Sequence, residues 1–272
     1  TLAVGKGPDK IQISDNDQTV YVSLAGEPGI AHYAFAEGLG SPPLARQLIA
    51  AGSGSADGHG HRALAAQSGW LLTPNPGDNS VSLVNPDGEH RILRDGNSPG
   101  PVALASHNGI LAQAIVGNTA SHTLSLFDPR SETVVTLSEV GQSPTDIALV
   151  PELGRAYVTM AGSNQVTVVD YLSAKKIGTV NTQQRPVHIY TAPPRIDSTA
   201  ALSIQHEGHD HGAVTEIWVG NDSGDSVTVF DAQTLAIIAH HPTGKGHHKM
   251  AFSQNKAYIS NITDGTLTVI PR

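Results

Sequence analysis

The sequence contains no cysteine and few aromatic or charged residues. Aromatic side chains make up 4% and charged side chains 15% of the 272 residues, and acids outnumber bases by 24 to 16. The absence of thiols excludes cysteine nucleophiles and zinc–thiolate sites, and it suits an oxidising compartment without requiring one. The net charge of −8 disfavours nucleic acid as a partner, because nucleic acid attracts a basic surface.

Long apolar runs and the local signatures of several enzyme classes are also missing. No run of about 18 apolar residues occurs, so no membrane span is expected. The sequence has no G-x-S-x-G elbow, no H-E-x-x-H, no C-x-x-C-H and no phosphate-binding glycine loop. It opens on Thr1-Leu2-Ala3-Val4 without a signal peptide, which we interpret as a mature or trimmed start.

Glycine and proline are abundant, with 28 and 17 copies, and a motif built on them recurs. The pattern G-x-x-P with alternating apolar residues appears as GKGPDKIQI from residue 5, GNSPGPVAL from 96 and GQSPTDIAL from 141. TQQRPVHIY from 182 is a weaker copy, and DGHGHRALA from 57 and GKGHHKMAF from 244 carry histidine near the proline position. The markers of the six units are Pro8, His59, Pro99, Pro144, Pro186 and His247, spaced by 51, 40, 45, 42 and 61 residues.

Each unit continues with short apolar strands in the same order, such as TVYVSLAG, then NQVTVVDY, then AKKIGTVNT. Four short strands in a tandem unit are typical of a propeller blade. We therefore expect an all-β, single-domain β-propeller over residues 1–272. Six blades are counted, and seven are possible if the long first or fifth unit contains a degenerate blade. Residues 1–4 are expected to form a strand that completes the last blade and closes the ring.

Two segments carry a family resemblance. AYVTMAGSNQVTVVD and AYISNITDGTLTVI resemble the YVTN family of β-propellers, whose repeat places Tyr-Val-Thr-Asn on its second strand. The likeness extends over nearly the whole chain and implies the propeller fold. It says little about function, because propellers include enzymes and binding modules.

Histidine is the unusual residue of this composition. There are fourteen, and eight of them fall within residues 188–248. Those at or beside the marker position precede the innermost strand of a blade, so they are expected to converge on one mouth of the channel. Three imidazoles and one carboxylate would make a tetrahedral zinc site, although polar channel lining is the simpler alternative. The expected ligands are His61 (or His59), His188, His248 (closely followed by His247) and Asp9, with Asp146 as the substitute carboxylate.

A second histidine cluster falls in an insertion of the fifth unit, between its first two strands. The sequence HEGHDH contains His206, His209 and His211 with acidic residues between them. Such a glycine-flanked loop can wrap a borderline cation, or it can be an ordinary solvated loop.

The histidine segments HGHR, RPVH, GHHK and HEGHDH on a thiol-free propeller are similar to those of the periplasmic zinc metallochaperones that serve ABC-type zinc importers. This resemblance implies a monomeric periplasmic protein that binds Zn²⁺, with Cu²⁺ as an alternative, and passes it to the importer's solute-binding protein. Members also carry a His/Asp-rich segment near the N-terminus, and none stands before Pro8 here. A metal-dependent hydrolase or lactonase and a protein-interaction propeller are the alternative functions.

Overall fold

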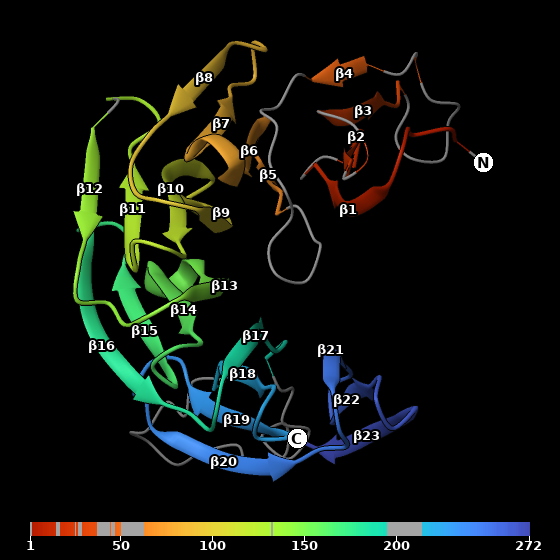
Figure 1. Ribbon diagram of the computed structural model, residues 1–272, viewed down its shortest axis with the longest axis vertical. Helices are drawn as coiled ribbons and strands as arrows, with labels where there is room; N and C mark the ends of the chain where they lie inside the picture. The colour runs from red at the N-terminus through yellow and green to blue at the C-terminus, as the bar shows by residue number, and fades with distance from the viewer. Residues whose placement is uncertain are drawn as a thin grey trace, which may run out of the picture.

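The computed structural model describes residues 2–14, 17–24, 26, 29–36, 44, 47–49, 63–131, 133–194 and 214–272. Over these residues the chain forms six antiparallel sheets that follow one another around a central axis (Figure 1). No helix in this part of the chain is long and apolar enough to cross a membrane. The predicted all-β propeller architecture is confirmed, with six blades in the described residues.

The blades take their strands in sequence order. Blade one contains β1 (Pro8–Ile13), β2 (Thr19–Leu24), β3 (Ile30–Ala34) and β4 (Gln47–Ile49). Blade two contains β5 (Ala65–Gln67), β6 (Trp70–Asn75), β7 (Ser80–Val84) and β8 (His90–Leu93), and blade three contains β9 (Pro99–His107), β10 (Ile110–Asn118), β11 (Thr123–Phe127) and β12 (Val134–Leu137). Blade four contains β13 (Pro144–Val150), β14 (Arg155–Met160), β15 (Gln165–Asp170) and β16 (Lys175–Asn181). Blade five contains β17 (Pro186–Thr191), β18 (Glu216–Asn221), β19 (Ser226–Asp231) and β20 (Ile237–Pro242), and blade six contains β21 (His247–Phe252), β22 (Lys256–Asn261) and β23 (Thr266–Pro271).

The core lies between consecutive blades. Between blades four and five, for example, Val166 and Val168 of β15 pack in one cluster with Ile189 of β17 and Ile217 of β18. The side chains of a strand alternate between its two faces, so the opposite face of each sheet is available to pack on the preceding blade. Burial of apolar area between adjacent sheets is therefore what holds the blades in sequence around the axis.

The recurring glycine and asparagine of the repeat contact each other, and this contact explains why both residues recur. In blade three, Nδ2 of the buried Asn118 donates to the hydroxyls of Thr123 (3.1 Å) and Ser125 (2.7 Å), which fixes the β10–β11 hairpin. A Cβ on Gly96 would lie 2.3 Å from the Asn118 side chain. Only glycine fits there, so the first residue of G-x-x-P makes room for the amide at the end of the second strand.

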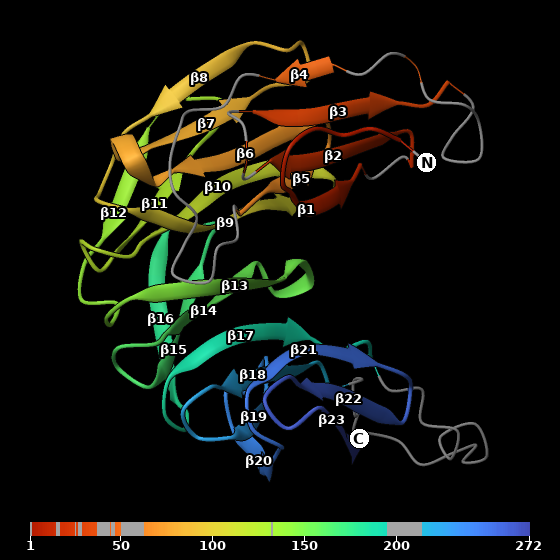
Figure 2. The ribbon, with the colours of Figure 1, turned by 45° about the vertical axis from the view of Figure 1, so that its right-hand side comes forward.

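The N-terminal residues do not close the ring, contrary to the sequence prediction. Blade six has three strands, and residues 2–5 form no strand. They lie against their own blade, where the Tyr33 hydroxyl donates to the Ala3 carbonyl and Val4 packs with Val22 and Leu24. Among the described strands, none of blade one pairs with one of blade six, and Figures 1 and 2 draw β1 and β21 apart from each other.

Candidate functional site

The innermost strands of the blades share an irregularity at their first residues. The pairing register between the first and second strands shifts between Pro8 and Ile11, between Pro144 and Asp146, between Pro186 and His188, and between His247 and Met250. Such bulges redirect side chains and are common beside functional sites. The shifted residues are those that the repeat predicted to line the channel.

Three histidines come together at the junction of blades five and six. The ring centroid of His188 lies 6.4 Å from that of His247 and 5.4 Å from that of His248, both in edge-on orientations. A bulge at the start of β21 separates His247 from Met250, and the rings of both His247 and His248 flank His188.

His247 occupies the position that is proline in other blades, and a glycine makes this possible. In blade four, Pro144 packs against Gly117 of the preceding blade, where an added Cβ would lie 2.8 Å from the proline ring. At the equivalent position of blade five, a Cβ on Gly220 would lie 2.3 Å from Nε2 of His247. The imidazole therefore fills the space of the proline ring and adds two nitrogen atoms to it.

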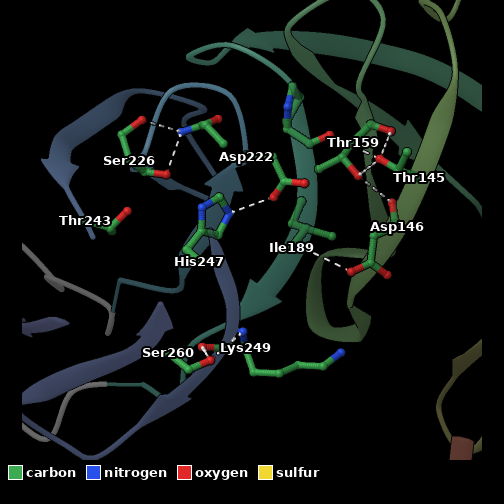
Figure 3. A network of polar contacts seen from close by, with 12 residues as sticks. Thr145, Asp146, Thr159, Ile189, Asp222, Ser226, Thr243, His247, Lys249 and Ser260 are labelled. Atoms are coloured by element: carbon green, nitrogen blue, oxygen red, sulfur yellow. Dashed lines mark hydrogen bonds and ion pairs between the residues drawn. The ribbon is translucent and has the colours of Figure 1, made fainter. Parts of the chain in front are cut away.

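A carboxylate faces the buried imidazole. His247 is 3% exposed, and its Nε2 lies 3.2 Å from Oδ1 of Asp222 (Figure 3). Both ring nitrogens and this Oδ1 lack a well-formed hydrogen bond within the described residues. Burial lowers the pKa of His247, opposed first by the charge of Asp222, so the ring favours its neutral, metal-binding form.

Asp146, the substitute carboxylate of the sequence prediction, has a different environment. Its carboxylate accepts hydrogen bonds from the backbone N–H groups of Ile147 (2.9 Å) and Ile189 (3.2 Å), which tie blade four to blade five (Figure 3). Burial raises its pKa, while Lys10 and Lys249 act in the opposite direction. Asp146 is thus held by backbone N–H groups, and the positive charges of Lys10 in blade one and Lys249 in blade six act on its carboxylate.

The other predicted ligands are placed less directly. Asp9 lies in the bulged part of β1 in blade one, and Figure 1 draws β1 apart from β21, the strand that begins with His247. No three His, Asp or Glu side chains of the described residues form a ready-made metal cluster. Five predicted ligands lie outside the described residues, namely His59, His61, His206, His209 and His211.

Asp222 was not predicted from the sequence. It follows the buried Asn221 in the turn sequence NDSGD, where aspartate is common for its local hydrogen bonding. In the sequence, Asp222 is distinguished by its position two residues after Gly220. Gly220 is the glycine against which His247, the marker residue of the next blade, packs. Recognising it required the contact between consecutive blades, which the sequence of one unit does not reveal.

No protein-family model matches the sequence, and no curated protein matches it either. Among solved structures, the dihydro-heme d1 dehydrogenase NirN aligns with 98% of this chain at 12% identity and a TM-score of 0.71, and the match spans only 55% of the NirN chain. A chain of the mitotic checkpoint complex aligns with 96% of this chain and 73% of its own, at 14% identity and a TM-score of 0.67. Virginiamycin B lyase from Staphylococcus aureus aligns with 95% and 78%, at 11% identity and a TM-score of 0.60. At these identities the similarity shows the β-propeller fold alone, and no zinc metallochaperone family is indicated.

Proposed function

We propose that this propeller binds Zn²⁺ as cargo through the histidine cluster of blades five and six. The observation that carries the proposal is His247, a buried imidazole without a well-formed hydrogen bond, whose Nε2 faces Asp222 at 3.2 Å. Leaving buried polar atoms unpaired is costly, and a cation between these two groups would remove that cost. Imidazole nitrogen with carboxylate oxygen is a donor set that zinc accepts readily.

Each residue has a distinct role in this proposal. His247 supplies the buried nitrogen, Asp222 supplies the charge that offsets that of the cation, and His188 and His248 supply imidazoles beside them. Because these groups do not form a ready-made cluster, binding requires small side-chain rotations. A site of this kind exchanges metal more readily than a rigid thiolate cage, which suits delivery better than permanent retention.

The proposed delivery role rests on treating zinc as cargo that the protein releases to a partner. We propose a monomeric periplasmic protein that passes zinc to the solute-binding protein of an importer, with the sequence segment containing His206, His209 and His211, which lies outside the described residues, as a second binding segment. This role needs no catalytic group. A metal-dependent hydrolase would need a general base beside an open metal position, and we assign no residue to that task.

Metal binding can be tested by zinc titration and by metal content after purification. We expect about two zinc ions per chain, since two separate histidine clusters are present. His247→Ala should remove the propeller site, and His188→Ala should weaken it at least tenfold, about 1.4 kcal/mol. His90→Ala on β8 is the matched control, because this exposed histidine lies in another blade and should leave zinc affinity unchanged.

Affinity should also fall at acidic pH, where imidazoles protonate and lose their lone pair, and because burial lowers the pKa of His247 the loss should occur below the range of a free imidazole, about pH 6.5. Zinc transfer to a purified solute-binding protein, followed by competition with a chromogenic chelator, tests delivery. A protein that binds no divalent metal above background contradicts the proposal. Zinc binding combined with cleavage of an ester or lactone would instead favour the hydrolase.

A further inference from the structure

The face of blade one that packs on blade two has a histidine where the other blades have an aliphatic residue. His32 on β3 pairs with Tyr21 on β2, and the two rings stack with centroids 5.2 Å apart and planes 14° apart. In the other blades the third-strand residue at this position is Leu83, Leu126, Val168, Val229 or Val269. Oε1 of Gln47 on β4 lies 3.2 Å from Nδ1 of His32 and helps to orient its ring.

The junction of blades four and five shows how such a face can be filled. Tyr157 is the counterpart of Tyr21, since each stands three residues before the end of its second strand. The Tyr157 ring packs on Phe230 with centroids 5.9 Å apart, and its hydroxyl donates to the Ala232 carbonyl at 2.6 Å. Leu235, in the turn after β19, packs on the same cluster. An aromatic ring and a leucine from the following blade therefore cover this tyrosine.

Blade two provides smaller side chains at the same place. Val84 stands at the repeat position of Phe230, and the turn after β7 has the sequence NPDGE, which contains no leucine. A cavity of about 460 Å³ lies between the outer strands of blade one and this turn of blade two. Pockets that bind small molecules have volumes of about 300–1,000 Å³, so this cavity is large enough for such a ligand.

The lining of the cavity combines an apolar floor with a polar rim. Leu71 and Val84 are buried core residues that form part of the floor, and His32, Asp87 and His90 belong to the rim. Among the described residues of the lining, Asp87 is the only one that carries a charge when the histidines are neutral. A bare metal ion would make no use of the apolar floor, whereas an organic cation would use both parts.

We propose that this cavity binds a small organic cation in which an amino group is attached to an apolar group. The ammonium lies beside the Asp87 carboxylate and the aromatic ring of Tyr21, and the apolar part covers Leu71 and Val84. This site lies between blades one and two, apart from the histidine cluster of blades five and six. It does not depend on zinc binding.

Phenethylamine is the probe for this site, with 2-phenylethanol as its neutral counterpart and 3-phenylpropionate as an anionic one. Isothermal titration and ligand-observed NMR at neutral pH measure their affinities. We expect phenethylamine to bind about tenfold more tightly than either of the other two compounds. Asp87→Asn should remove this preference, because the change keeps the size of an exposed turn residue and removes its charge.

Val84→Phe tests the volume of the cavity. It gives blade two the aromatic residue that blade five has at this position, so it should fill the cavity and abolish phenethylamine binding. Val135→Phe, at a position on β12 that is 42% exposed, is the matched control and should leave phenethylamine binding unchanged. Circular dichroism and thermal unfolding verify that both variants fold, and Asp87→Asn keeps the test decisive if the larger side chain disturbs packing.

Preference for the amine, together with its loss in Asp87→Asn and the loss of binding in a folded Val84→Phe protein, supports the proposal. The absence of saturable phenethylamine binding at about 10 mM overturns it. Binding that survives Val84→Phe, or tighter binding of the alcohol or the anion, overturns it as well. Zinc titration of the Val84→Phe protein should match that of the wild type, so a failure of this site is distinguishable from a failure of zinc binding.

Discussion

At the scale of single residues, position 247 differs from the equivalent position of four other blades, where the residue is proline. Proline at this position packs on the preceding blade and contributes no donor atom. Histidine packs in the same place against Gly220 and introduces a buried imidazole facing Asp222. The histidine keeps the contact between blades and adds two ring nitrogens to it, which are the basis of the proposed metal site.

Gly220→Ala should test this arrangement without removing any ligand. The new methyl group would lie 2.3 Å from Nε2 and 2.6 Å from Cδ2 of His247, so the ring must turn away from its present position. We expect zinc affinity to fall about tenfold and stability to fall by about 1–3 kcal/mol from overpacking. Isothermal titration and urea denaturation measure the two effects.

Gly117→Ala is the matched control, because its methyl group would crowd Pro144 and Pro101 at the equivalent place in blade three. It should cost similar stability and leave zinc affinity unchanged. Equal zinc affinities in both variants and the wild type would show that the position of the His247 ring does not matter for binding.

At the scale of strands and turns, the same polar contact fixes several hairpins between the second and third strands. Buried asparagines donate to hydroxyl groups five and seven residues later, as Asn221 does to Ser226 (3.3 Å) and Thr228 (3.1 Å). Blade four has Met160 at this position, and there Thr167 donates to the Val140 carbonyl instead. In blade four the partner of the buried third-strand hydroxyl therefore comes from outside the hairpin.

Asn118→Ala should destabilise blade three by about 1–3 kcal/mol, because it leaves the partly buried hydroxyl of Thr123 and the buried hydroxyl of Ser125 without their amide partner. Denaturant unfolding of this variant and of Asn97→Ala, an exposed asparagine in the same blade, provides the comparison. Equal free energies of unfolding for the two variants would contradict the structural role of the amide.

At the scale of the whole molecule, the junction of blades five and six is secured by one buried ion pair. Nε of Arg272 lies 3.0 Å from Oε2 of Glu216 on β18, and both side chains are at most 3% exposed. The same guanidinium donates to the carbonyls of Pro193 and Ser253, and Trp218 donates its indole N–H to Glu216. This network connects the end of blade six to the blade that carries His188.

Arg272→Ala should cost about 3–5 kcal/mol, because it leaves the Glu216 carboxylate buried without its cation. Adding Glu216→Gln should recover part of the loss, since a neutral amide can still accept from Trp218. Thermal and urea unfolding of the single and double variants measure this coupling. A double variant as unstable as the sum of both single changes would contradict the proposed pairing.

The sequence by itself determined the fold, because each of the six repeat units carries the strand pattern of one blade. The glycine and the proline recur in most units and the alternating strands in all of them, and in blade three the contact between Gly96 and Asn118 shows the steric reason for the glycine. It also placed His188, His247 and His248 in one region, since equivalent positions of a repeat become neighbours around the axis.

Only the tertiary structure decided which groups face one another. The bulge at β21 let both His247 and His248 flank His188, Gly220 gave the His247 ring its space, and Asp222 faced it from a turn of the preceding blade. These outcomes depend on contacts between blades and on a local departure from strand alternation. A sequence pattern records the period of a strand, whereas the direction of each side chain at a bulge is set by the sheet packed beside it.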